Sequence, residues 1–396
     1  MTDIRNFTRA SPPKEFAQRA TRTLRSAADL AAAGLVAPDD APGIAQVAAR
    51  YAVAVTPDMA RLIEPGQADD PIARQFVPQA AELITTPEER ADPIGDDAHA
   101  PLPETAPGLV HRYPDRVLLK LLHVCPVYCR FCFRRETVGP QVSGKSGAGS
   151  MTPEAFAAAL GYIRARPEIW EVILTGGDPF MLSPRRIAEV SLAIAAIAHV
   201  KVLRWHTRVP VADPGRVTPD LAAALRCEGV ATYVAIHANH PRELTPAALA
   251  AISRLADAGI VLLSQTVLLR GVNADAAVLA DLMRAFVAAR VKPYYLHHPD
   301  LAPGTSHFRL GIAEGQEIVR QLRGRVSGLC QPTYVLDIPD GHGKVPIGPA
   351  YLTPVDRPAG SLKGDKFEVV DINGSRHPYP PASTPAAADR PPQRRE

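Results

Sequence analysis

The sequence predicts an α/β fold with a mostly parallel sheet, either an open sheet or a partial β/α barrel. Two observations predict it. After residue 106, short apolar stretches typical of buried strands alternate with Ala-rich stretches of helical periodicity. The strand–helix–strand spacing then recurs along the chain, as parallel strands with crossover helices require. The chain has 396 residues, 46% of them hydrophobic, which is enough to bury a sizeable core.

Charge and cysteine content exclude several classes of protein. The 44 basic and 41 acidic residues leave a net charge of +3, so no strong field recruits nucleic acid or an anionic membrane. Five cysteines are too few for a disulfide scaffold. The N-terminus lacks an apolar signal region, and charged residues interrupt the most apolar stretch, 187–203. We therefore expect a soluble, cytoplasmic protein.

The first 105 residues predict an N-terminal helical region followed by a Pro-rich linker. Residues 14–35 and 43–63 carry apolar residues at helical spacing. Residues 84–109 are polar and rich in Pro, which indicates a linker or an extended wrap.

Residues 106–300 are expected to form the β/α core. Their apolar strand-like stretches are 117–124, 170–175, 201–206, 230–237, 259–267 and 292–297. The helical patterns between them are 153–166, 184–198, 218–227, 246–257 and 275–289.

A C-terminal extension, 301–376, follows the core. It contains a long loop, a helical pattern at 313–327 and a further strand at 333–337. Residues 377–396 are rich in Pro and have no hydrophobic pattern, which predicts a disordered tail.

The strongest local motif is a cluster of three cysteines, Cys125, Cys129 and Cys132, directly after the first core strand. Three thiolates from one short loop suit a soft metal. A structural zinc site normally has four protein ligands, and a four-iron ferredoxin has a fourth cysteine. A cluster with one open iron therefore fits best, with zinc as the alternative.

Polar residues follow the next strands at the end where β/α barrels collect their chemistry. Gly176 and Gly177 follow the second strand, Arg208 the third and His237 the fourth, while Gln265 lies near the end of the fifth. Each alone is more often a structural loop residue. Together they predict one shared site.

Lys344 lies in a Gly-rich loop, Asp337-Ile-Pro-Asp-Gly-His-Gly-Lys344. Ile338 and Val345 occupy positions where a phosphate-binding Walker loop needs Gly and Ser or Thr, which excludes that motif. Such a lysine suits covalent binding of pyridoxal phosphate, with a solvated surface lysine as the alternative. The two guanidiniums of Arg112 and Arg116 suit a phosphate dianion, unless they only form a charged turn.

The CxxxCxxC spacing with an aromatic residue before the last cysteine resembles the signature of the radical S-adenosylmethionine superfamily. Together with Lys344 and the arginine pair, the sequence from Asp70 to Leu352 is similar to the lysine 2,3-aminomutase family. The resemblance implies a partial (β/α)6 TIM-like barrel with an N-terminal helical layer and a C-terminal extension that carries the pyridoxal phosphate lysine. It also implies a 4Fe–4S cluster, S-adenosyl-L-methionine and pyridoxal 5'-phosphate as cofactors.

The resemblance further implies a role for each matching residue. Cys125, Cys129 and Cys132 bind the cluster, and Lys344 is catalytic and binds pyridoxal phosphate together with Arg112, Tyr113 and Arg116. Gly176, Gly177, Arg208, His237 and Gln265 contact S-adenosylmethionine. Arg134 binds the substrate α-carboxylate, and Asp300 and Asp337 bind its distal ammonium.

The implied reaction is the isomerisation of L-lysine to β-lysine by radical 1,2-amino migration. Two buried carboxylates select a substrate with a distal positive charge and repel glutamate. Arginine stays open on charge alone. The resemblance also implies an external electron donor such as flavodoxin or ferredoxin.

Some features depart from the better-known family members. The tail lacks the extra cysteines of a zinc site, and Cys227 and Cys330 are isolated, so a homo-oligomer linked through zinc is not expected, whereas other dimer contacts stay open. His297 replaces a tyrosine, as in the branch that supplies β-lysine to elongation factor P.

Two other functions stay open. One is a different radical S-adenosylmethionine reaction in which Lys344 is merely structural. The other is a non-catalytic binding module in which the cysteines bind a metal that only fixes the loop.

Overall fold

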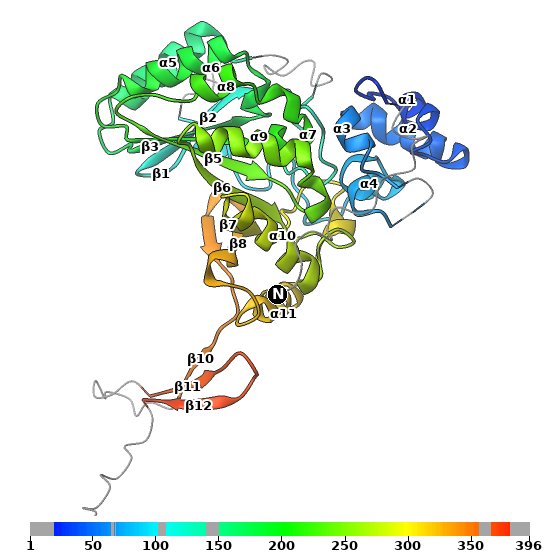
Figure 1. The fold of residues 1–396 in the computed structure, drawn as a ribbon, viewed down its shortest axis with the longest axis vertical. Helices are drawn as coiled ribbons and strands as arrows, with labels where there is room; N and C mark the ends of the chain where they lie inside the picture. Colours follow the sequence, from blue (N-terminus) through cyan, green and yellow to red (C-terminus); the bar gives the residue numbers. More distant parts are fainter. Residues whose placement is uncertain are drawn as a thin grey trace, which may run out of the picture.

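The computed structural model describes residues 20–64, 67, 69–101, 108–139, 150–355 and 366–380. Among these residues, no helix is both long and apolar enough to cross a membrane. Figure 1 shows a curved sheet with helices along its outer side, a layer of small helices beside it, and a short second sheet that projects from the body.

The main sheet contains nine strands in the order of the chain. Strand β1 (Leu109–Tyr113) pairs antiparallel with β2 (Arg116–Leu122), and β9 (Gly343–Pro346) pairs antiparallel with β8 (Thr333–Ile338). Strands β2 to β8 are parallel. The strands between β2 and β8 are β3 (Glu171–Gly176), β4 (Val202–Thr207), β5 (Ala231–His237), β6 (Val261–Val267) and β7 (Lys292–His297).

This sheet confirms the predicted partial barrel and all six predicted core strands. Strand β8, which sequence analysis assigned to the extension, joins the same sheet as a seventh parallel strand. Each predicted helical stretch of the core also contains a helix. The helices from residue 150 onward are α5 (Pro153–Arg164), α6 (Pro184–Ala195), α7 (Val209–Ala212), α8 (Pro219–Ala224), α9 (Pro246–Asp257), α10 (Ala276–Ala288) and α11 (Ile312–Leu322).

A Ser–Pro or Thr–Pro pair begins four of these helices. The hydroxyls of Thr152, Ser183, Thr218 and Thr245 each accept a backbone N–H from the first turn, and the proline that follows occupies the first helical position. A hydroxyl cap satisfies a free backbone donor, and proline at this position loses no hydrogen bond. The sequence thus defines where these four helices begin.

The N-terminal layer has its own small core. Its helices are α1 (Ala27–Ala32), α2 (Ala41–Arg50), α3 (Pro57–Ala60) and α4 (Pro71–Phe76). Their buried side chains, such as Val47 and Phe76, pack in one cluster with Val127 of the cysteine loop. The continuous helical pattern predicted over 43–63 is wrong, because extended residues separate α2 from α3. Residues 14–19 of the other predicted helix lie outside the described residues.

The last strand of the sheet meets the first. The backbone N–H of Lys344 in β9 donates a 2.7 Å hydrogen bond to the Tyr113 hydroxyl in β1. Residues of the predicted linker lie beside this contact, since His99 Nε2 is 2.8 Å from the carbonyl oxygen of Gly341. Here the linker forms part of the wall of the barrel.

A three-stranded antiparallel sheet follows β9. Its strands are β10 (Leu352–Pro354), β11 (Phe367–Val370) and β12 (Arg376–Tyr379), and Figure 1 shows it extending away from the barrel. Residues 377–379 of the predicted disordered tail lie in β12, and residues 381–396 lie outside the described part of the chain.

Candidate active site

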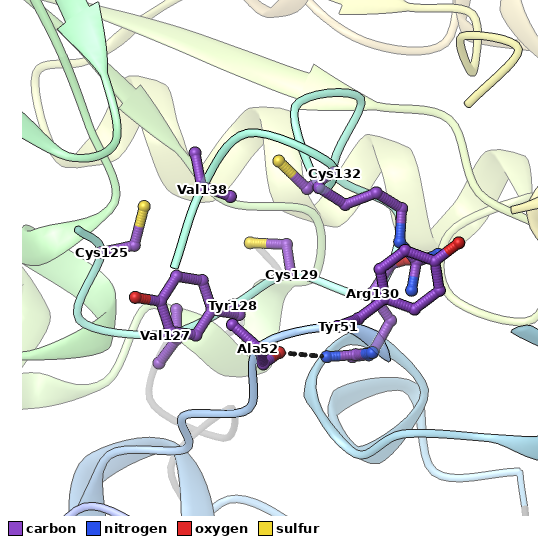
Figure 2. A pocket seen from close by; sticks show the side chains of 10 residues that line it. Tyr51, Ala52, Cys125, Val127, Tyr128, Cys129, Arg130, Cys132 and Val138 are labelled. Carbon is purple, nitrogen blue, oxygen red and sulfur yellow. Dashed lines mark hydrogen bonds between the residues drawn. The ribbon is translucent and has the colours of Figure 1, made fainter. Parts of the chain in front are cut away.

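The cysteine loop leaves the carboxyl end of β2. Cys125, Cys129 and Cys132 are all partly exposed thiols that line one pocket together with Tyr128 and Val138. Figure 2 shows their three sulfur atoms around a common space on one side of the loop. The part of the chain that the structure describes contains no three His, Cys, Asp or Glu side chains arranged around a single metal ion.

Burial raises the pKa of all three thiols, and that of Cys129 reaches about 11. Neighbouring thiols raise the pKa of Cys125 and Cys129 further, whereas the guanidinium of Arg208 acts in the opposite direction on Cys129. Three thiolates side by side need positive charge among them. A soft, cationic iron–sulfur cluster supplies that charge, and three cysteines leave one of its irons open.

A buried ion cluster supports this loop from the N-terminal layer. Both carboxylate oxygens of Glu82 accept hydrogen bonds from Arg130, at 2.6–3.0 Å, and Glu82 also binds Arg135. Arg135 donates in turn to the carbonyl oxygen of Gly304, at 3.1 Å. Although burial opposes it, the charges of Arg130 and Arg135 lower the pKa of Glu82. One carboxylate therefore connects the segment before the linker, the cysteine loop and the loop after β7.

The glycine motif after β3 packs directly against the strand that leads into the cysteines. Any side chain on Gly177 would collide with the backbone of Val124. The N–H of Asp178 donates to the Val124 carbonyl at 2.9 Å, and its carboxylate accepts from the Thr207 hydroxyl and the Arg208 N–H. The motif thereby connects the loops that follow β2, β3 and β4.

The predicted S-adenosylmethionine residues lie on adjacent strands. His237 in β5 pairs in register with Gln265 in β6, and its ring centroid is 5.8 Å from that of His206 in β4. Burial lowers the pKa of His237 to about 3, so the ring is neutral. Arg208 is buried and donates to Glu243 and to Gln75 of α4, which orients its guanidinium beside Cys129.

Lys344 lies in a polar group contributed by three strands. Its Nζ donates to the Asp337 carboxylate of β8 and is 3.3 Å from Nδ1 of His297 in β7. Burial opposes ionisation of Asp337, but the hydrogen bond from His297 and the charge of Lys344 hold its pKa well below the usual value. Gly343 adopts φ +94°, and a side chain there would lie 3.2 Å from the Tyr113 hydroxyl.

Asp300 is the second predicted substrate carboxylate, on the loop after β7. Burial, and then the charge of Asp337, raise its pKa to about 7, while Lys344 and Arg134 oppose the rise. Asp300 in turn raises the pKa of Cys132. The lysine site and the cysteine loop are therefore close enough to share an electrostatic environment.

The predicted phosphate-binding and carboxylate-binding arginines lie in two different parts of the site. Arg116 stacks on the Tyr113 ring, with its guanidinium carbon 3.8 Å from the ring centroid, beside the Lys344 loop. Arg112 and Arg134 both bind the buried Asp96, at 3.3 and 3.0 Å. The amine of Lys120 is 3.5 Å from the same carboxylate.

The sequence analysis missed Asp96, Lys120 and Glu82 as site residues. Asp96 and Glu82 lie at or near the stretch interpreted as a linker, where no periodicity predicts burial. Lys120 lies in the middle of an apolar strand. Lys120 could have been found from the sequence, because a charged residue on a strand predicted to be buried indicates a functional or paired side chain.

Comparison with known proteins identifies the family. Residues 119–283 match the model of the Radical SAM superfamily, and residues 319–360 match the model described as Lysine-2,3-aminomutase. The L-lysine 2,3-aminomutase of Clostridium subterminale is 39% identical over 314 residues, which cover 79% of this chain and 73% of that protein. The chain belongs to the lysine 2,3-aminomutase family.

The relatives of this chain are named for different amino acid substrates. The L-lysine 2,3-aminomutase of Escherichia coli is 34% identical and covers 72% of this chain and 80% of its own length. The Glutamate 2,3-aminomutase of Clostridioides difficile is 36% identical and covers 78% of this chain and 70% of its own length. Membership therefore defines an isomerase but does not by itself select the amino acid.

Membership also implies a 4Fe–4S cluster, S-adenosylmethionine and pyridoxal phosphate. The residues present fit these groups. Three soft sulfur donors suit the cluster, the close-packed backbone at Gly177 suits a ligand at the strand ends, and Lys344 offers an amine among polar partners. His297 Nε2 and His206 Nε2 are also buried polar atoms without a hydrogen-bond partner among the described residues.

Replacing Glu82 with Gln should destabilise the protein by about 3–5 kcal/mol, because two buried guanidiniums lose their shared countercharge. Chemical denaturation monitored by circular dichroism measures this. Glu189→Gln removes an exposed carboxylate that also contacts two arginines, and should leave the unfolding midpoint unchanged. Equal effects of the two substitutions would contradict the structural role assigned to Glu82.

Proposed function

We propose that the protein is a radical S-adenosylmethionine, pyridoxal phosphate-dependent 2,3-aminomutase that interconverts L-lysine and β-lysine. The observation that carries the choice of substrate is the carboxylate pair Asp300 and Asp337 beside Lys344. Asp337 already binds one primary ammonium, Nζ of Lys344. A second lysine, as substrate, presents the same chemical group.

The charge of this pair argues against an acidic substrate. Asp337 stays ionised, and Asp300 loses its proton near neutral pH. A distal carboxylate would bring a third negative charge to the pair, whereas a distal ammonium neutralises it. L-Lysine fits this arrangement and L-glutamate does not. L-Arginine has the same charge and is the alternative substrate.

Positively charged side chains surround Asp96. Arg112, Lys120 and Arg134 share this one carboxylate, which leaves two positive charges in excess. Such an excess favours anions, and planar guanidiniums bind carboxylate or phosphate through paired hydrogen bonds. We assign Arg134 to the substrate α-carboxylate, and Arg112, Tyr113 and Arg116 to the cofactor phosphate.

Bound cluster and S-adenosylmethionine supply a radical that removes hydrogen from the substrate, and pyridoxal phosphate carries the migrating nitrogen. The chain binds and orients these groups: Cys125, Cys129 and Cys132 hold the cluster, and Lys344 holds the cofactor. We assign Gly176, Gly177, Arg208, His237 and Gln265 to S-adenosylmethionine. Precise positioning is the protein's main contribution to such chemistry.

The cluster needs an electron from outside the chain. We propose a flavodoxin or ferredoxin as donor, and the cytoplasm as the compartment, because free thiols persist where the surroundings are reducing. The five described cysteines are all unpaired in the structure, which supports this assignment.

Reconstituted protein should convert L-lysine to β-lysine. The full chain is loaded anaerobically with iron, sulfide and pyridoxal phosphate, then given S-adenosylmethionine, dithionite and L-lysine, and the products are separated by chromatography with mass detection. Cys129→Ala and Lys344→Ala should abolish the product. Cys227→Ala, which removes a cysteine outside the loop, should retain it.

The outcomes separate the alternatives. Deoxyadenosine without β-lysine would retain the radical chemistry and reject lysine, and L-arginine and L-glutamate are then tested under the same conditions. Neither product, from protein that demonstrably holds its cluster, would favour the non-catalytic module.

Binding of L-lysine should release a proton from Asp300. Below about pH 7 this carboxyl is protonated in the free protein, and an adjacent ammonium favours its ionised form. Affinity should therefore rise with pH, by at most about tenfold per unit, and level off above about pH 7. Calorimetry in buffers of different ionisation enthalpy measures the released proton.

Asp300→Asn is the control for this assignment. The variant should bind L-lysine more weakly, and its proton release between about pH 6 and 7 should fall relative to the parent protein. Proton release that is identical in Asp300→Asn would assign the titration to another group.

A further inference from the structure

The side chain of His297 contacts the reactive lysine but has no role in the assignments above. It projects from the end of β7, with Nδ1 at 3.3 Å from Nζ of Lys344 and 3.6 Å from the Asp337 carboxylate. Its ring meets Tyr295 edge-on, with centroids 5.7 Å apart. The imidazole is thus positioned between an amine and a carboxylate.

We propose that His297 accepts the proton that Lys344 must lose before its amine can react with the cofactor aldehyde, while Asp337 holds both groups in place. This inference rests on the proposed attachment of pyridoxal phosphate to Lys344. In that step His297 is the proton acceptor and Asp337 is the positioning residue.

The proton balance of the step is simple. The proton moves from Nζ of Lys344 to Nδ1 of His297, so one N–H bond breaks as another forms and the pair keeps a single positive charge. The neutral amine would then form a carbon–nitrogen double bond at the aldehyde carbon as the carbon–oxygen bond breaks, and the two remaining amine hydrogens leave with the oxygen as water. An ammonium cannot make this attack because it has no lone pair.

Transfer of the proton removes one of the two effects that lower the pKa of His297. Burial lowers the pKa of His297, and the charge of Lys344 lowers it further, while Asp337 raises it. When Lys344 gives up its proton, its opposing charge disappears and the Asp337 carboxylate remains. The resulting imidazolium would then face a carboxylate rather than an ammonium.

Other titratable groups face His297 across the interior of the barrel. Burial lowers the pKa of His206 and His237 and keeps both rings neutral, and a positive charge on His297 lowers both pKa values further. They therefore neither supply nor remove the proton at neutral pH. The groups that face His297 from other elements are Asp337 in β8, Lys344 in β9, His206 in β4 and His237 in β5.

The neighbouring His298 provides a matched control. Its Nδ1 is 2.7 Å from the Tyr334 hydroxyl, a residue outside the group of Lys344 contacts. His298→Gln therefore makes the same chemical change one residue away, without removing a partner of Lys344. Because it lies next to His297 in sequence, it also tests for general damage to the end of β7.

The test measures how fast the full, cluster-loaded chain, stripped of pyridoxal phosphate, forms its cofactor imine. Pyridoxal phosphate is mixed in and the visible absorbance of the imine is followed by stopped flow across a range of pH. His297→Gln should slow imine formation by about 100-fold at neutral pH, the lower range for a lost proton acceptor. Its rate should recover at alkaline pH, where hydroxide replaces the imidazole as proton acceptor, and His298→Gln should match the parent protein.

Two outcomes would overturn the inference: a parental rate and pH profile in His297→Gln, or a loss of rate that persists at every pH. His297→Asn, checked by circular dichroism, repeats the test if the first variant folds poorly. Lys344→Ala distinguishes this inference from the proposed function. Imine absorbance that survives in Lys344→Ala contradicts the proposed attachment, whereas an unchanged His297→Gln contradicts the proton transfer alone.

Discussion

The hydrogen bond between the Lys344 N–H and the Tyr113 hydroxyl connects the last strand of the nine-stranded sheet to the first, and the candidate site lies at this contact. The two residues are 231 positions apart in the chain. Arg116, at the start of β2, stacks on the same Tyr113 ring. Both ends of the row of strands therefore contribute residues to the candidate site.

Opposite charges gather in different parts of the candidate site. Three cations surround Asp96 on one side, and two carboxylates surround Lys344 on the other. In the proposed function, an amino acid with a carboxylate at one end and an ammonium at the other complements this arrangement in one orientation only.

The sequence predicts the parts of this site that are local or follow from sheet topology. Cys125, Cys129 and Cys132 lie within one loop, so spacing alone reveals them. Gly177 and His237 follow from the rule that the carboxyl ends of parallel strands meet at one edge. The hydrogen bond of the Tyr113 hydroxyl, the role of Glu82 and the clustering at Asp96 depend on contacts between distant segments, and no local pattern predicts those.

A crystal structure of the chain loaded with cluster, pyridoxal phosphate and S-adenosylmethionine tests the account most directly. Anomalous iron density should contact Cys125, Cys129 and Cys132 with no fourth protein ligand, and continuous density should run from Nζ of Lys344 to the cofactor. A fourth protein ligand on the cluster, or a cofactor attached elsewhere, would contradict the proposed site.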